Sequence, residues 1–144
     1  MPDQSADALA KKLRLMPETR LLALNAPDGY LALLDGHVVS IATHAQAGET
    51  YDAAHVFVRE KAQAQAALPT AIGAVRPDSV LWVMWPKQSS GVKTDLNRDS
   101  LAALAMTFGW GPVSNVSINE TWSALRLRPE ISVKRTGTAG APQE

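Results

Sequence analysis

The sequence predicts an α/β fold of three layers, in which helices cover a mostly parallel sheet that ends in an antiparallel hairpin. Short apolar segments with the composition of strands alternate with helix-like segments, as they do where helices connect parallel strands. Near the end of the chain two segments, 112–119 and 122–129, alternate apolar with polar residues on either side of a tight "NET" link. This spacing is typical of an antiparallel hairpin.

The first half of the chain predicts two helices and three strands. An amphipathic helix ends before Pro17, and the almost wholly apolar run that follows has the composition of a strand buried on both faces. A short helix then ends at Gly36, and two further strands flank the loop "AQAGET". In chain order these five elements are expected at 5–15, 19–26, 28–36, 37–44 and 51–58.

The second half predicts two helices separated by the strongest strand of the chain. Alanine, glutamine and lysine favour a helix at 59–75, bent or interrupted near Pro69. The run "VLWVMW" at 80–85 is rich in strand formers. The next helix, "RDSLAALAMTFG", starts at Asn97 or Asp99, because both residue types cap helix N-termini.

Length and composition indicate a soluble globular protein. The 144 residues fit a single domain at 1–135, in which 1–17 form an N-terminal helix and linker, and the small polar tail 136–144 is expected to be disordered. The formal net charge is zero, which argues against a broad surface for duplex nucleic acid or anionic lipid. No apolar run approaches the ~20 residues that a membrane helix needs, so we expect no membrane association and a cytoplasmic location.

The residue types also exclude several kinds of chemistry. The absence of cysteine removes disulfides, thiolate catalysis and cysteine-based zinc or iron–sulfur sites. The three histidines, His37, His44 and His55, lack the spacing of metal ligands, and no "G-x-S-x-G" elbow supports a serine hydrolase. We therefore predict neither a metal nor a cofactor.

A ligand site in such a fold is expected at one edge of the sheet. In open parallel sheets ligands bind beyond the carboxyl ends of the strands, near the point where the strand order reverses. We expect the first and fourth strands to be neighbours there, so that their loops are the better candidates. The segments that follow strands at this edge are "NAPDGY" (25–30), "THAQ" (43–46), "VRE" (58–60), "PKQSSGVKTD" (86–95) and "INETW" (118–122).

The loop after the first strand lacks the determinants of a dinucleotide or S-adenosylmethionine site. It offers one glycine, Gly29, where a glycine-rich turn is wanted. The second strand ends in Thr43 and His44, where an acidic residue would hold ribose hydroxyls. Two interpretations stay open: a plain turn in which Asp28 caps the next helix, or a ligand loop to which Asn25 and Asp28 contribute.

The loop after the fourth strand is rich in polar groups. Pro86 ends the strand because it cannot donate to a ladder, and the turn around Gly91 has the composition of an anion-holding nest of backbone N–H groups near a helix N-terminus. A phosphate or carboxylate would be its natural ligand, although the spacing of a phosphate loop is absent. The alternative is a solvated loop whose hydroxyls bond to local backbone. The candidate site residues are Lys87, Ser89, Ser90, Gly91, Lys93, Thr94 and Asp95.

The hairpin turn supplies a third candidate. Glu120 beside Trp122 is either a buried acid with a raised pKa or a turn carboxylate paired with a lysine. One hypothesis is that Trp122, Trp85 and Trp110 form the aromatic wall of a pocket. Core packing accounts for Trp82 more simply, but its indole N–H then needs a hydrogen-bond partner.

Two resemblances follow from these segments. The order of elements resembles the Rossmann-like fold of the class I methyltransferases, whose sheet also ends in an antiparallel hairpin. The segments "WPKQSSGVKTDL" and "NETWSALRLRP", with "LNAPDGY", resemble a small bacterial family known as a domain of unknown function (number three-zero-five-two), over residues 13–128. Asn119 and Ala124 stand where that family has an acid and a glycine. The resemblance implies the fold and the importance of these loops, and it implies no reaction.

Three functional hypotheses remain. The leading one is a non-catalytic or regulatory module that holds an anionic small molecule or a partner protein at the loop after the fourth strand. The second is a divergent transferase in which Lys87, Asp95 and Glu120 converge as acid–base and electrostatic groups. The third is a homo-oligomer whose interface is formed by the tryptophans and the edge of the terminal hairpin.

Overall fold

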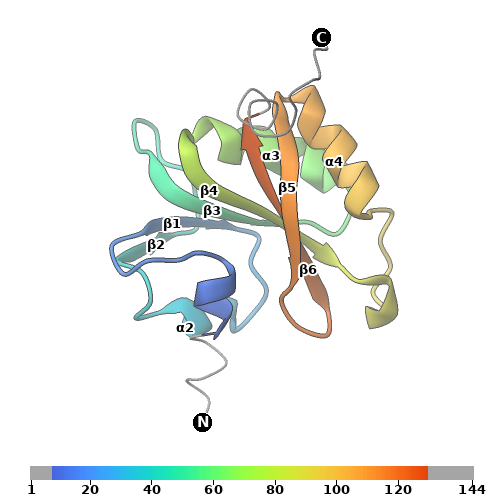
Figure 1. The fold of residues 1–144 in the computed structure, drawn as a ribbon, viewed down its shortest axis with the longest axis horizontal. Helices are drawn as coiled ribbons and strands as arrows, with labels where there is room; N and C mark the ends of the chain where they lie inside the picture. The colour runs from blue at the N-terminus through green and yellow to red at the C-terminus, as the bar shows by residue number, and fades with distance from the viewer. Residues whose placement is uncertain (1–7, 130–144) are drawn as a thin grey trace.

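A computed structural model describes residues 8–129 and confirms the predicted fold class (Figure 1). One six-stranded sheet runs through the molecule in the order β2-β1-β3-β4-β6-β5. Strands β1, β2, β3 and β4 are parallel to their neighbours among these four, whereas β6 pairs antiparallel with both β4 and β5. The strands are β1 (Arg20–Leu24), β2 (Ser40–Ala42), β3 (Tyr51–Phe57), β4 (Val75–Pro86), β5 (Trp110–Ser117) and β6 (Trp122–Pro129).

Helices cover both faces of this sheet. The two longer helices, α3 (Lys61–Gly73) and α4 (Arg98–Thr107), pack on one face with the apolar cluster that contains Leu68 and Leu101. Helical residues 8–12 and the short α2 (Tyr30–Leu34) pack on the other face. Figure 1 shows α3 and α4 above the central strands and the other two helical segments below them. The sequence therefore builds the three layers that its alternating pattern predicts.

The tryptophans belong to the core of the chain. Trp82 is 1% exposed, and its indole N–H donates a hydrogen bond to the carbonyl of Leu13 at 3.0 Å, which supplies the partner that a buried indole needs. Trp85, Trp110 and Trp122 are buried as well. These side chains pack inside the chain, and the homo-oligomer stays a hypothesis.

Several element boundaries differ from those expected. Strand β2 has three residues where eight were predicted, and β4 begins at Val75, which pairs with Tyr51. Helix α3 runs through Pro69 without interruption. Of the predicted segments, the beginning of the first helix and the tail 136–144 lie outside the described residues. No helix among residues 8–129 is long and apolar enough to cross a membrane.

Strand order corrects the expected position of the switch point. β1 lies between β2 and β3, so the chain reverses direction across the sheet between β1 and β3. The fourth strand, β4, is separated from β1 by β3. The expectation that the first and fourth strands are neighbours is therefore wrong. The short segment after β3 lies beside the switch point, between the two loops that were favoured.

Candidate functional site

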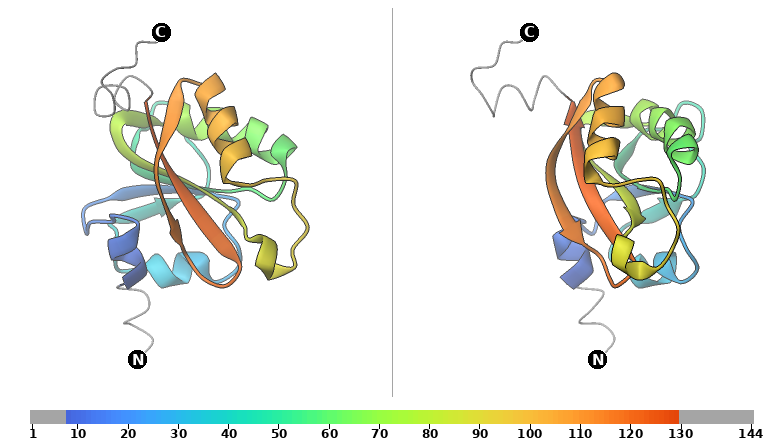
Figure 2. Two further views of the ribbon diagram at one scale, coloured as in Figure 1. Left: turned by 45° about the vertical axis from the view of Figure 1, so that its right-hand side comes forward. Right: turned by 90° about the vertical axis from the view of Figure 1, so that its right-hand side faces the viewer.

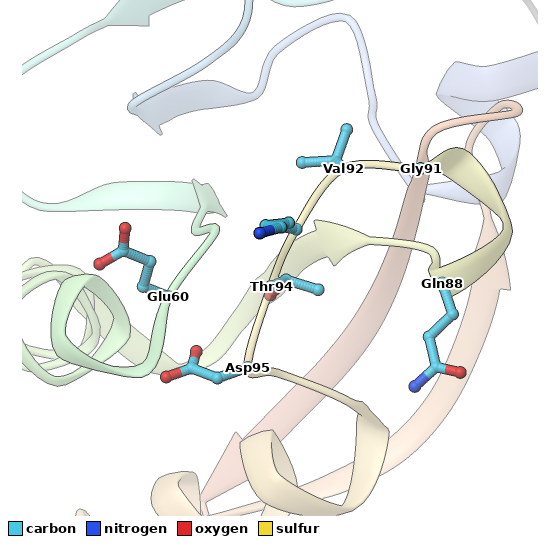
Figure 3. A pocket seen from close by; sticks show the side chains of 7 residues that line it. Glu60, Gln88, Gly91, Val92, Thr94 and Asp95 are labelled. Atoms are coloured by element: carbon cyan, nitrogen blue, oxygen red, sulfur yellow. The ribbon is translucent and has the colours of Figure 1, made fainter.

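The carboxyl edge of the sheet holds a cavity of about 580 Å³ between the segment after β3 and the loop after β4. We call it the loop cavity. Figure 3 shows Glu60 on one side and Thr94 and Asp95 across from it, with Gln88 at the far end. Its volume lies within the range of small-molecule sites. The lining residues are Glu60, Gln88, Gly91, Val92, Lys93, Thr94 and Asp95.

Two of the predicted site residues fasten loop 87–97 to the start of α3. The hydroxyl of Thr94 donates to the carbonyl of Arg59 at 2.6 Å, and a carboxylate oxygen of Asp95 accepts the N–H of Lys61 at 2.8 Å. Lys61 is the first residue of α3, and its N-cap residue makes no side-chain capping bond. Asp95 thus caps α3 from another element, which satisfies an N–H that the helix itself leaves without a partner.

The expected anion nest is not formed. Residues Gln88–Ser90 form a short 3-10 helix, η1, and the N–H groups of the turn bond within the loop. The N–H of Ser90 donates to the carbonyl of Lys87 at 3.0 Å, and that of Gly91 to the carbonyl of Gln88 at 3.5 Å. The N–H of Val92 donates to the hydroxyl of Ser90 at 3.2 Å. Ser89 is exposed at the surface of this turn.

Lys87 joins the loop to the hairpin rather than to the cavity. Its ammonium group donates to the hydroxyl of Ser117 at 2.6 Å, and its backbone N–H donates to the carbonyl of Thr121 at 2.7 Å. The turned views in Figure 2 show η1 beside the turn between β5 and β6. Lys87 therefore lies outside the lining of the loop cavity, although Lys93 of the same loop is part of it.

Glu120 is exposed at the hairpin turn and is not a buried acid. The turn is held instead by Asn119, whose side-chain oxygen accepts the N–H groups of Thr121 and Trp122 at 2.8 and 2.9 Å. Since Asp95 caps α3 and Lys87 bonds to Ser117, the three groups of the transferase hypothesis do not converge on one cavity. Glu120 does not line it.

Sequence analysis missed the free carboxylate of the loop cavity. Glu60 follows β3, and among the described residues it makes neither a side-chain hydrogen bond nor an ion pair. Lys93 is likewise without such a bond within the described part of the chain. The signal for Glu60 in the sequence is its place in "VRE", directly after a strand. Because β4, and not β3, was expected beside β1, this segment was not expected at the switch point.

A second cavity, of about 350 Å³, lies beside the end of β1, and we call it the β1 cavity. Asn25 and Gly29 of the adjoining loop both have left-handed backbone, with φ of 59° and 86°. Such a conformation is uncommon for a residue other than glycine, and asparagine tolerates it better than most. The lining residues are Leu24, Asn25, Gln63, Ala66, Ala67 and Thr70.

The plain-turn interpretation of loop 25–29 is only partly correct. Gly29, and not Asp28, is the N-cap of α2, and α2 has no side-chain capping bond. Asp28 is exposed and does not line the β1 cavity, whereas Asn25 does. At the end of β2, Thr43 and His44 hydrogen-bond to each other at 3.2 Å, and no carboxylate takes their place.

A buried polar and aromatic cluster lies on the other face of the sheet. The hydroxyl of Tyr30 and Nδ1 of His55 are 2.8 Å apart, and both side chains are buried. Burial raises the pKa of Tyr30 and lowers the pKa of His55 to about 3, so both groups are neutral at ordinary pH. Phe57 packs edge-on against Tyr30 and Trp122, which places Trp122 in the core below the hairpin.

Among the described residues, no group of three or more His, Cys, Asp or Glu side chains is arranged to hold a metal ion.

No protein-family model matches the sequence, and no curated protein matches it. The fold, in contrast, is similar to many solved structures.

Three of these solved structures are enzymes by name. A SAM-dependent methyltransferase from Geobacter sulfurreducens, in complex with S-adenosyl-L-homocysteine, is 11% identical, with a TM-score of 0.58 over 88% of this chain and 90% of that one. The CcbJ methyltransferase from Streptomyces caelestis is 10% identical, with a TM-score of 0.59 over 90% of each chain. The [4+2]-cyclase SpnF is 12% identical, with a TM-score of 0.60 over 88% of this chain and 81% of that one.

The fold is therefore that of the class I methyltransferases, as the order of elements predicted. At these identities the similarity shows the fold alone. The leading hypothesis of a non-catalytic, anion-binding module is nevertheless contradicted, because the neighbours of this fold include SAM-dependent methyltransferases, some of them with S-adenosylhomocysteine bound. The transferase alternative agrees better with these findings, although not with the three residues first assigned to it.

Proposed function

We propose that this chain is a transferase of the class I methyltransferase type, with S-adenosylmethionine as the methyl donor. The observation that carries the proposal is the position of the two cavities. Glu60 and Gln63, one turn apart at the start of α3, line the loop cavity and the β1 cavity respectively, so the cavities flank the same turn beside the switch point. A transferase needs two adjoining sites, one for the donor and one for the acceptor.

The β1 cavity has a chemistry that suits the adenosine part of the donor. Its floor is apolar, from Leu24 and two alanines, and its polar groups are the amides of Asn25 and Gln63 and the hydroxyl of Thr70. A flat heterocycle with a polar edge fits such a lining. Asn25 and the amide N–H groups of Gln63, whose oxygen already accepts the backbone N–H of Arg59 at 2.7 Å, would hold that edge. When bound, S-adenosylmethionine supplies an electrophilic methyl group.

A binding experiment with a matched pair of variants tests the donor site. Ala66 and Ala62 are both exposed on α3, but only Ala66 lines the β1 cavity. Titration of S-adenosylhomocysteine by calorimetry is expected to show binding, which Ala66→Trp weakens by about tenfold or more by filling the cavity, while Ala62→Trp leaves it unchanged. Absence of binding at millimolar ligand, or equal binding by both variants, contradicts the proposal.

We further propose that the chain belongs to the small bacterial family that its segments "WPKQSSGVKTDL" and "NETWSALRLRP" resemble. A cytoplasmic location and a single domain at 1–135 are the setting in which we expect the enzyme to act. A resin-bound S-adenosylhomocysteine that retains the full-length chain and releases it with free ligand would test the same donor site in a second way.

A further inference from the structure

We propose that the loop cavity binds an α-amino carboxylate group, whose ammonium end lies against Glu60 and whose carboxylate end lies against Lys93. This inference deepens the proposed function, on which it rests only for the source of that group. The residues that line the loop cavity are of two kinds: those already bonded within the protein and those available to a ligand.

Most polar groups of the lining are already used inside the protein. Thr94 bonds to Arg59, and Asp95 caps the first N–H of α3. Gly91 contributes a backbone N–H that bonds within η1. A buried or bonded group gains little from a ligand, because it would exchange one hydrogen bond for another.

The charges that remain have opposite sign. Glu60 and Lys93 line the same cavity, and neither makes an ion pair or a side-chain hydrogen bond within the described residues, including with each other. Each retains its full capacity: two acceptor oxygens on Glu60 and three donor hydrogens on Lys93. Gln88, an amide, lines the same space.

A dipolar ligand satisfies this pair better than a simple ion does. A bare anion at Lys93 faces the carboxylates of Glu60 and Asp95, and a bare cation at Glu60 faces Lys93. An α-amino carboxylate carries both charges on adjacent atoms and forms a charge-assisted bond at each end. The free groups of the loop cavity thus favour an amino-acid group over a phosphate.

This chemistry has two sources in a methyl-transfer reaction. S-adenosylmethionine carries an α-amino carboxylate at the end opposite its adenosine, so the donor itself would reach from the β1 cavity into the loop cavity. Alternatively, the acceptor is an amino acid or a molecule with a free amino-acid end. Both sources place the same group between Glu60 and Lys93.

Three probes separate these sources by calorimetry or by ligand-observed NMR: S-adenosylhomocysteine, 5′-methylthioadenosine and a panel of free proteinogenic amino acids. 5′-Methylthioadenosine keeps the adenosine and the thioether but lacks the amino-acid end. The variants are Glu60→Gln and Lys93→Met. The matched controls are Glu120→Gln, exposed at the hairpin turn, and Lys87→Met, in the same loop but outside the lining.

If the donor supplies the group, S-adenosylhomocysteine binds about tenfold or more tightly than 5′-methylthioadenosine, because two charge-assisted bonds are added. Glu60→Gln and Lys93→Met then remove that difference without changing the affinity for 5′-methylthioadenosine, and the controls keep it. If the acceptor supplies it, the two adenosyl probes bind equally, and a free amino acid binds to the wild type but to neither cavity variant.

Equal binding of the two adenosyl probes together with no binding of any amino acid overturns the inference. So does an effect of Glu60→Gln or Lys93→Met that both controls reproduce. Failure of both adenosyl probes to bind contradicts the proposed donor site instead, and the amino-acid titration still decides what the loop cavity holds.

Discussion

Loops 87–97 and 25–29 lie at the same edge of the sheet but are held in place by different means. Loop 87–97 is fixed by side chains that bond to other elements: Lys87 to the hairpin, and Thr94 and Asp95 to the start of α3. Loop 25–29 is shaped by its own backbone, with left-handed residues at both ends, and its Pro27 carbonyl accepts the N–H of Tyr30 at 3.1 Å. Much of the polar composition of loop 87–97 therefore holds the loop in place, and among the described residues Lys93 is left without a protein partner.

Whether a polar side chain already has a partner within the protein determines whether it is available to a ligand. A hydroxyl or carboxylate that already caps a helix or bonds to a carbonyl contributes to the position of the loop, and its removal costs folding stability. A charged group without a protein partner is available to a ligand. By this criterion Glu60 and Lys93 are better site candidates than Lys87 and Asp95.

The largest effect is expected where loop 87–97 is anchored in the core. Leu96 is 2% exposed and packs in the apolar cluster beneath α4. Leu96→Ala removes buried methyl groups and leaves a cavity, which lowers the free energy of unfolding by about 2–5 kcal/mol. Urea unfolding measures the change, and Val92→Ala in the exposed part of the loop is the control, with an effect near zero. An equal loss in both variants would mean that the loop has no core anchor.

Acidification tests the buried pair below loop 25–29. The pKa of His55 is lowered by burial from 6.5 to about 3 in the folded protein. The unfolded state therefore binds the extra proton between these values, and the free energy of unfolding falls by about 1.4 kcal/mol per pH unit as pH drops below 6.5. Urea unfolding at pH values down to about 4.5 measures this slope, above the range in which carboxylates such as Asp52 contribute.

The His55→Asn variant is the control for that slope, since it keeps a polar group near Tyr30 and removes the titration. Its free energy of unfolding is expected to vary much less with pH over the same window. A wild-type profile that is flat between pH 6.5 and about 4.5 would show that the imidazole is not held neutral in the core.

Local signals in the sequence predicted the helices and strands, but they could not predict which strands pair with each other in the sheet. Helix α4 begins after Asn97, which accepts the N–H of Ser100 at 2.8 Å, and β4 ends at Pro86. Both signals are confined to a few residues. The placement of β3 beside β1 depends on how the whole chain crosses the sheet, and for this reason Glu60, which follows β3, was not among the predicted site residues. The bonds of Asp95 could not be foreseen, because its partner lies 34 residues away.

Removal of the Tyr30 hydroxyl tests the same buried pair and is expected to change the free energy of unfolding by a smaller amount. Tyr30→Phe leaves Nδ1 of His55 without the partner it has at 2.8 Å, in a site fully removed from water. The free energy of unfolding is expected to fall by about 1–3 kcal/mol, the cost of a buried polar group that has lost its bond. The double variant Tyr30→Phe with His55→Leu is expected to recover part of that loss, and a wild-type-like Tyr30→Phe would contradict the bond.

The smallest effect separates a structural from a catalytic role for Asp95. Asp95→Ala removes the cap of α3 and is expected to lower the free energy of unfolding by about 1 kcal/mol. Asp95→Asn keeps an oxygen that accepts the N–H of Lys61, so its stability stays within about 0.5 kcal/mol of the wild type. Affinity for S-adenosylhomocysteine is expected to be unchanged in Asp95→Asn, because the carboxylate is bonded to the helix. A large loss of ligand affinity in this isosteric variant, without a loss of stability, would return Asp95 to the site and make the two loops alike.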